Sequence, residues 1–269
     1  MRSDRATIVE LVILATTAAA IGLLLDGILL WVAAAGLAAA TAFGAFAFLY
    51  EHEPRGVPIE SLAGSVVAAV AMLGLAHLAG IAPTLLPALL AGAALLAGSL
   101  VMERRMLGPY DGDAGRHRNQ LVQLTVLLSF AGFIAVAGAV PGGLAQARST
   151  AGEAAPQIAA GSFALLAAGD AVIAFLLGYR LAALRTTSAR QAAWAGGTFA
   201  GLVAVAALAV RAVALSALIG PAVLTVVFYL WAAYRAAPGS ERRSASWLWE
   251  YGLIAIAAAV LAAWNLLVR

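Results

Sequence analysis

Long apolar runs separated by short polar gaps extend along almost the whole chain. The runs are solid rather than alternating, and they are rich in Ala, Leu and Val. A helix needs about 20 mostly apolar residues to cross the hydrocarbon core of a membrane, and only helices or closed barrels satisfy their backbone hydrogen bonds in lipid. The pattern predicts an all-α, polytopic integral membrane bundle of about nine transmembrane helices. The predicted spans are residues 7–25, 28–50, 60–81, 84–102, 120–140, 157–179, 192–212, 214–234 and 247–267.

Composition supports this class of protein. Hydrophobic residues make up 64% of the chain and charged residues 11%, whereas soluble domains have about 25% charged residues. The gaps between the predicted spans are short, so we expect residues 1–269 to form a single transmembrane domain with no soluble domain. The absence of cysteine excludes disulfides and thiolate metal sites. We expect no catalytic residues, no metal and no cofactor.

The distribution of arginine predicts an orientation. Thirteen of the sixteen arginines precede the first span or follow the second, fourth, sixth and eighth, and only Arg148, Arg211 and Arg269 fall on the other side. Short loops rich in arginine remain in the cytoplasm. We therefore expect a cytoplasmic N-terminus, a C-terminus outside, and location in the cytoplasmic (inner) membrane of a bacterium. The inner arginines favour anionic lipid headgroups, and their dispersion over five short loops argues against nucleic-acid binding.

Two boundaries admit alternatives. The first span has a charged start and small residues near its end, which is also typical of a cleaved signal peptide, although Glu10 inside the apolar stretch favours a retained helix. The run 192–234 is long enough for two spans, but few polar or helix-breaking residues mark the turn between them. A turn at Gly220 and Pro221 would leave too few residues to cross, so we place the turn near Arg211 and expect Pro221 to kink the first turns of the eighth helix.

One ionisable residue lies near the middle of the sixth span. Asp170, in LLAAGDAVIAF, carries a carboxylate that costs about 2.5–3.5 kcal/mol to insert at the membrane centre. It must therefore be protonated, paired or exposed to water. Two interpretations remain open, a proton- or cation-linked functional site and an interhelical hydrogen bond that pins the sixth helix.

Three more polar residues lie toward the predicted outer half of the membrane: Asp26 in the first hairpin turn, His77 near the end of the third span, and Arg211 near the end of the seventh. Arg211 can extend outward to lipid headgroups, and a lone histidine on an apolar helix is more often a packed residue than a ligand. The alternative hypothesis is that Asp170, His77 and Arg211 converge on an outward-opening polar cavity. Arg211 would then be the counter-ion of Asp170 or of an anionic substrate. The candidate intramembrane site is Asp170, Arg211, His77 and Asp26.

Three functions fit the sequence. The first is a small secondary transporter or permease with a midplane carboxylate. The second is a non-catalytic membrane subunit or scaffold that binds a membrane protein partner or a second copy of itself, and Gly197 and Gly201 serve either such a dimer or intrachain packing. The third is an enzyme acting on lipid headgroups at the cytoplasmic interface. The lack of a catalytic motif favours the first two. The polar residues available to such an enzyme are Glu51, His52, Glu53, Arg104, Arg105, Asp111, Asp113, Arg116 and His117.

Overall fold

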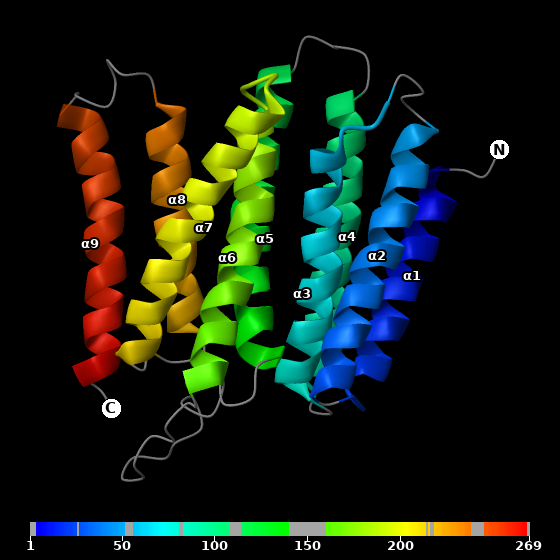
Figure 1. Ribbon diagram of the computed structural model, residues 1–269, viewed down its shortest axis with the longest axis horizontal. Coiled ribbons are helices and arrows are strands. Elements are labelled where there is room, and N and C mark those ends of the chain that lie inside the picture. The colour runs from blue at the N-terminus through cyan, green and yellow to red at the C-terminus, as the bar shows by residue number, and fades with distance from the viewer. Residues whose placement is uncertain are drawn as a thin grey trace. The chain divides into compact units, whose positions relative to one another are not determined.

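The computed structural model describes residues 4–25, 27–51, 56–80, 83–107, 114–139, 160–213, 215, 218–237 and 245–267. Helices account for nearly all of these residues, and no strand occurs among them (Figure 1). The predicted all-α helical bundle is confirmed. The elements are α1 (Asp4–Gly22), α2 (Ile28–Tyr50), η1 (Ile59–Leu62), α3 (Ala63–Ala79), α4 (Leu85–Leu107), α5 (Ala114–Ala139), α6 (Ala160–Ala183), α7 (Ala189–Ala212), α8 (Ile219–Ala236) and α9 (Ala245–Leu267).

The lengths of these helices suit a membrane. Within the described ranges, eight helices are long and apolar enough to cross one, and α9 contains a shorter apolar stretch, Trp249–Asn265. Helices α4 and α5 continue beyond the predicted spans at their arginine-containing ends, because a helix does not have to stop where the hydrocarbon stops. The molecule has the architecture of a multi-pass membrane protein.

The eighth helix differs from its prediction. It begins at Ile219 rather than at residue 214, so Pro221 is its third residue. The first N–H groups of a helix have no intrahelical acceptor, and a proline there removes no hydrogen bond. The cause of the predicted kink at Pro221, a hydrogen bond lost inside the helix, is therefore absent. With 18 residues and a rise of about 1.5 Å per residue, α8 is roughly 27 Å long.

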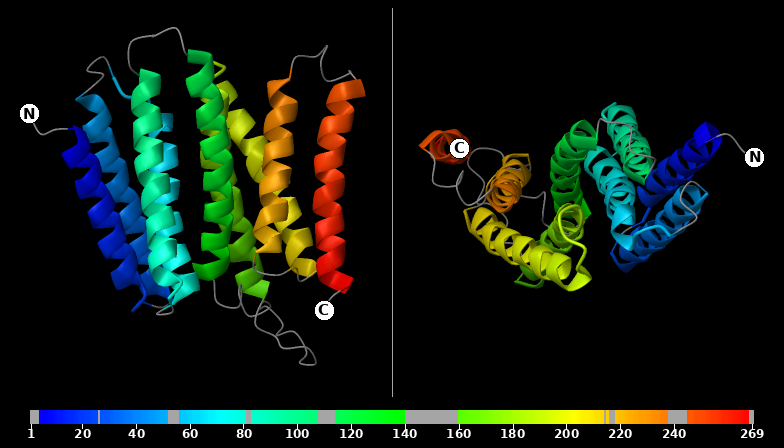
Figure 2. Two further views of the ribbon diagram at one scale, coloured as in Figure 1. Left: turned by 180° about the vertical axis from the view of Figure 1, so that it is seen from behind. Right: turned by 90° about the horizontal axis from the view of Figure 1, so that it is seen from above.

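The chain folds into two compact units, Met1–Ala139 and Val140–Arg269. The first unit contains α1–α5, and α3 is its centre because it packs against α1, α2, α4 and α5 (Figure 2). The second unit contains α6–α9. There α6 packs mainly against α7, α7 against α8, and α8 against α9.

Glycines set the closest helix contacts of the first unit. Gly74 of α3 lies against the backbone of Ala135 in α5, and a Cβ atom on Gly138 would lie 2.8 Å from the carbonyl oxygen of Gly74. Gly92 of α4 faces Met72, where a Cβ would come within 2.6 Å of the Met72 side chain. Small residues allow this approach, which dispersion forces and close packing then stabilise in a membrane.

A hairpin of α6 and α7 forms the core of the second unit. Ser188 caps α7 by accepting a hydrogen bond from the Gln191 N–H. A Cβ atom on Gly178 would lie 2.5 Å from the ring of Phe199, and one on Gly196 would lie 3.1 Å from the Cβ of Tyr179. These contacts fix the register of the two antiparallel helices.

The helix α8 packs on α7 through aromatic rings. The rings of Phe199 and Phe228 have centroids 4.9 Å apart. The Trp231 indole N–H donates to Thr198 Oγ1 at 3.1 Å. By contrast, a Cβ atom on Gly197 or Gly201 would meet nothing within 4 Å. Gly196, and not the Gly197 and Gly201 pair, therefore makes the close glycine contact on α7.

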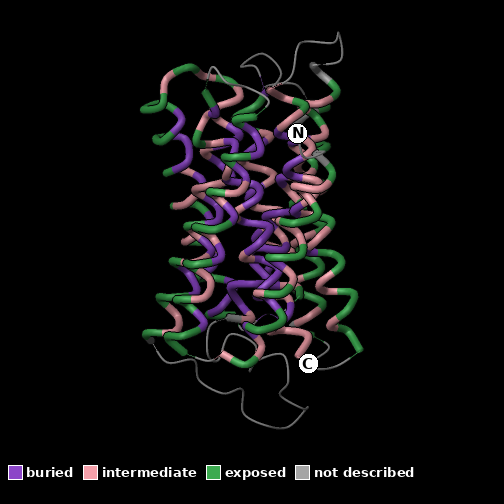
Figure 3. Tube along the Cα trace, turned by 90° about the vertical axis from the view of Figure 1, so that its right-hand side faces the viewer, coloured by how far each residue is buried: buried purple, intermediate pink, exposed green. Residues whose placement is uncertain are grey.

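Exposed residues occur along the length of the helices (Figure 3). Many of them carry large apolar side chains. Phe43 is 76% exposed, Trp194 is 76% exposed and Leu267 is 82% exposed. Water would penalise such a surface, whereas lipid would not. The exposed surface thus agrees with a protein embedded in a membrane.

The first prediction concerns the α3–α5 contact. Gly74→Ala is expected to lower the stability of the protein by about 1–3 kcal/mol, because the new methyl group overlaps the backbone of α5 and a backbone cannot move aside cheaply. Gly36→Ala on α2 is the matched control, since nothing lies within 4 Å of the added Cβ. It should leave stability unchanged or raise it by up to about 1 kcal/mol through helix propensity. Thermal unfolding of the purified protein in detergent measures both, and equal midpoints would contradict the predicted contact.

Candidate functional site

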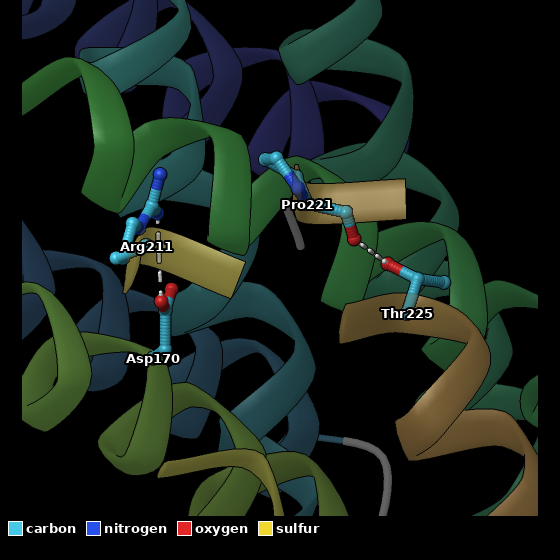
Figure 4. A network of polar contacts seen from close by, with 4 residues as sticks. All are labelled: Asp170, Arg211, Pro221 and Thr225. Carbon is cyan, nitrogen blue, oxygen red and sulfur yellow. Dashed lines mark hydrogen bonds and ion pairs between the residues drawn. The ribbon is translucent and has the colours of Figure 1, made fainter. Parts of the chain in front are cut away.

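An ion pair is buried between α6 and α7. The Nη2 atom of Arg211 lies 3.6 Å from Oδ2 of Asp170, and the two side chains are 1% and 0% exposed (Figure 4). Arg211 therefore does not extend outward to the surface, which was one of the two interpretations of the sequence. Its guanidinium points toward the carboxylate instead. Of the candidate residues, these two are brought together.

The geometry of the hairpin explains how they meet. The contacts of Gly178 and Gly196 place the Cα of Asp170 about two helical turns, roughly 10 Å, from the level of Arg211 along α7. Side chains on a helix lean toward its N-terminus. Because α6 and α7 are antiparallel, the two side chains lean toward each other. The long arginine covers most of the remaining distance.

The pair is poorly satisfied in hydrogen bonds. Both carboxylate oxygens of Asp170, and Nε and Nη2 of Arg211, are buried and have no hydrogen-bond partner. At 3.6 Å, Nη2 of Arg211 and Oδ2 of Asp170 are close enough for their charges to attract each other but too far apart for a hydrogen bond. Buried polar groups in native proteins are nearly always bonded, so an unbonded set of four atoms calls for a specific cause. A group that exchanges partners during function is one such cause.

The start of α8 lies beside this pair. A Cβ atom on Gly220 would be 3.9 Å from Nη1 of Arg211 and 3.0 Å from Cγ1 of Val210. Both Gly220 and Pro221 are buried. The Thr225 hydroxyl donates to the carbonyl oxygen of Pro221 at 2.9 Å (Figure 4). Three helices of the second unit therefore contribute to the site.

The other two candidate residues are His77 and Asp26. His77 is half-buried on α3, which belongs to the first unit, whereas the pair belongs to the second. Asp26 lies outside the described residues.

The polar residues at the predicted inner interface are described only in part. His52, Glu53, Asp111 and Asp113 lie outside the described ranges. In the portion of the chain that the structure describes, no group of three or more His, Asp or Glu residues is arranged to hold a metal ion.

Two buried charges were missed by the sequence reasoning. Glu103 near the end of α4 is 2% exposed and Arg180 near the end of α6 is 6% exposed, and both have interactions within the fold. The predicted spans ended at residues 102 and 179, so both residues were assigned to the solvated loops. Their position directly beside an apolar run was the available signal, since a helix commonly continues past its apolar segment.

The arrangement offers limited but definite chemistry. One carboxylate can bind or release a proton, and one guanidinium can bind the carboxylate or another anion. Electrostatic attraction is strong in a low-dielectric interior, so a change of charge at one residue changes the environment of the other.

The second prediction tests whether the pair acts as a unit. Arg211→Gln leaves the Asp170 carboxylate buried without a counter-ion, and we expect it to lower stability by about 3–5 kcal/mol. The double variant Asp170→Asn with Arg211→Gln removes both charges and should recover most of that loss. Unfolding of the two single variants and the double variant in detergent gives the coupling energy. Additive effects would show that the two side chains do not interact.

Comparison with known proteins adds no family to these observations. The chain matches no protein-family model, no curated protein and no solved structure. The chemistry of the pair therefore carries the functional inference.

Proposed function

We propose that the protein is a small secondary transporter or permease, and that a proton is taken up and released at the Asp170–Arg211 pair during transport. In one state Asp170 is ionised and paired with Arg211. In the other, Asp170 is protonated and Arg211 is released. The observation that carries this proposal is a fully buried ion pair in which both carboxylate oxygens of Asp170, and Nε and Nη2 of Arg211, have no hydrogen-bond partner.

A purely structural role accounts less well for these atoms. A polar contact that only pins helices together is best made with complete hydrogen bonding, because each unbonded buried atom costs free energy. Thr198 and Trp231 provide such a contact at 3.1 Å elsewhere in the same unit. Ionisable residues inside a membrane, moreover, commonly mark ion or substrate pathways.

The location of the pair fits exchange with one side of the membrane. Asp170 lies ten residues from Arg180, the arginine near the predicted inner end of α6, which corresponds to about 15 Å along the helix. Arg211 lies in the last turn of α7. With the orientation predicted from the arginines, the pair occupies the outer half of the membrane. A proton or solute would enter it from outside.

Release of the pair would also loosen the helices around it. When Asp170 is neutral, the attraction that holds the end of α7 against α6 is lost. The end of α7 and the start of α8 are the segments beside Arg211. Their displacement would supply the second state that alternating access requires.

A second candidate function rests on the surface of α7. Gly197 and Gly201 are exposed, and nothing lies within 4 Å of their Cβ positions. Small residues four apart are typical of helix association in membranes, so a scaffold that binds a membrane protein partner or a second copy remains the alternative. Purification from native membranes with a stoichiometric second chain would favour it over an independent transporter.

The third prediction tests transport. Protein reconstituted in liposomes with a trapped pH-sensitive dye should move protons in response to an imposed solute gradient. Asp170→Asn should abolish this movement, because asparagine matches the shape of aspartate and cannot take up the proton. Since this variant leaves the Arg211 guanidinium buried without a counter-ion, the double variant Asp170→Asn with Arg211→Gln, which leaves neither charge unpaired, is assayed beside it and should also be inactive. Glu250→Gln is the matched control. It makes the same change at an exposed position of the second unit.

The controls decide the outcome of this experiment. Glu250→Gln should transport at the wild-type rate. If the wild type moves neither protons nor solutes across a broad panel, or if Asp170→Asn is as active as the wild type, the transport proposal is overturned.

A further inference from the structure

The contact between α7 and α8 brings two exposed arginines to the same end of the second unit. Trp231 of α8 donates to Thr198 of α7, which fixes the register of these two antiparallel helices (Figure 1). Residues four apart share a face of a helix. One turn from this hydrogen bond, toward the predicted cytoplasmic end, lie Trp194 on α7 and Arg235 on α8, and Arg190 follows one turn farther along α7.

The two arginines are close enough to bind one phosphate group. Their Cα atoms differ in level by about one turn, roughly 6 Å, and packed helices lie about 8–10 Å apart. The Cα atoms are therefore roughly 11 Å apart, and two extended arginine side chains can reach one anion between them. Both Arg190 and Arg235 are exposed, and neither side chain has an ion pair or hydrogen bond with the residues that the structure describes.

The charge at this end of the second unit is positive. Between residues 180 and 250 the chain carries seven arginines and two glutamates. Arg211 is already paired with Asp170 near the other end of α7, and the remaining arginines still outnumber the glutamates. Such an end attracts anions, and the cytoplasmic leaflet of a membrane supplies them as lipid headgroups.

Aromatic side chains lie next to the two arginines. Trp194 is 76% exposed. The rings of Trp231 and Tyr234 stack with centroids 5.4 Å apart, and the hydrogen bond to Thr198 holds the indole of Trp231 in place. Trp and Tyr are enriched at the level of lipid headgroups, because one part of the ring system is apolar and another is polar. These rings therefore indicate that the arginines lie at the depth of the headgroups.

Beyond Trp194 the same face of α7 is apolar. Gly197, Gly201 and Leu208 follow at spacings that keep them on this face. Both glycines are exposed with nothing within 4 Å of their Cβ positions, and Leu208 is 42% exposed. From Trp194 to Leu208 the face extends roughly 21 Å along the helix, which exceeds the depth of one leaflet of the hydrocarbon core, about 15 Å.

We propose that this surface of α7 and α8 binds one anionic phospholipid of the leaflet that is predicted to be cytoplasmic. Arg190 and Arg235 bind the phosphate through charge-assisted hydrogen bonds. Trp194 packs beside the headgroup, and an acyl chain lies along the face that contains Gly197 and Gly201. The lipid site is separate from the buried ion pair and does not depend on the proposed transport.

Charge disfavours a second copy of the chain on the same surface. Two copies in one membrane that pair about an axis along the membrane normal bring identical surfaces together at identical depth. Arg190 and Arg235 of one copy would then face the same two arginines of the other, and like charges across an interface cost free energy. A lipid phosphate carries the opposite charge and covers the same face.

The fourth prediction measures the lipid preference of this surface. Full-length protein is reconstituted in phosphatidylcholine vesicles that contain brominated phosphatidylglycerol or brominated phosphatidylcholine, whose bromine atoms quench nearby tryptophans. The signal of Trp194 is the difference between each protein and its Trp194→Phe counterpart. One arginine near an anionic lipid contributes a preference of about fivefold. The wild type should therefore prefer phosphatidylglycerol at Trp194 by about 25-fold.

Variants at the two arginines test whether the lipid is bound at one place. Arg190→Gln and Arg235→Gln should each lower the preference about fivefold, and the double variant should abolish it. Arg105→Gln is the matched control, because it removes an exposed arginine at the arginine-containing end of α4 in the first unit. It should leave the preference at Trp194 unchanged. An equal loss in this control would indicate general surface charge and would overturn the site.

Two other results would overturn the lipid as the occupant. Displacement of brominated phosphatidylglycerol by inorganic phosphate at constant ionic strength would show that the arginines bind free phosphate. Absence of quenching at Trp194 by either brominated lipid would show that a protein covers the face. A lipid preference that depends on both arginines supports the site whether or not the protein transports, because the Asp170–Arg211 pair is unchanged in every variant.

Discussion

The second unit depends on one constraint, which is that a charge cannot lie in a nonpolar interior without an opposite charge close to it. Asp170 and Arg211 meet this constraint at 3.6 Å, and the surrounding helices are arranged so that they can. The α6–α7 hairpin supplies antiparallel helices whose side chains lean toward each other, and Gly178 and Gly196 fix the register. Removing one charge would leave the other buried and uncompensated, which is the most costly state for such a pair.

The same packing keeps the pair from becoming fully bonded. The register places Arg211 about two turns beyond Asp170, roughly 10 Å along the helix axis, so the arginine must extend toward the carboxylate and reaches it only to ion-pair distance. A shorter distance would allow a bidentate, hydrogen-bonded pair. In the observed register the two charges attract each other, but their hydrogen-bonding capacity is not filled. Donors on Arg211 and acceptors on Asp170 therefore remain available. Availability of this kind is what exchange of a proton or an anion requires.

Much of the fold could be predicted because the membrane limits a span to about 20 apolar residues, and α2 and α7 end within a few residues of their predicted limits. The start of α8 could not be predicted in this way, because the apolar sequence continues from α7 into α8. Only Gly220 and Pro221 indicate where one helix gives way to the next. The pairing of Asp170 with Arg211 was one hypothesis among several. It depends on register, which the contact of Gly196 rather than Gly197 decides, and apolar patterns do not distinguish adjacent glycines. His77 was grouped with the pair by depth alone, and it lies on α3 of the first unit.

The energy of the pair comes close to what a complete two-state switch needs. To move a two-state equilibrium from 1:99 to 99:1 requires about 5.5 kcal/mol, and breaking a buried ion pair costs about 3–5 kcal/mol. A proton on Asp170 removes the attraction without leaving an unpaired charge on that residue, but it leaves the Arg211 guanidinium without a counter-ion. In the proposed transport function, uptake of a proton at Asp170 therefore has to be matched by a new counter-charge for Arg211.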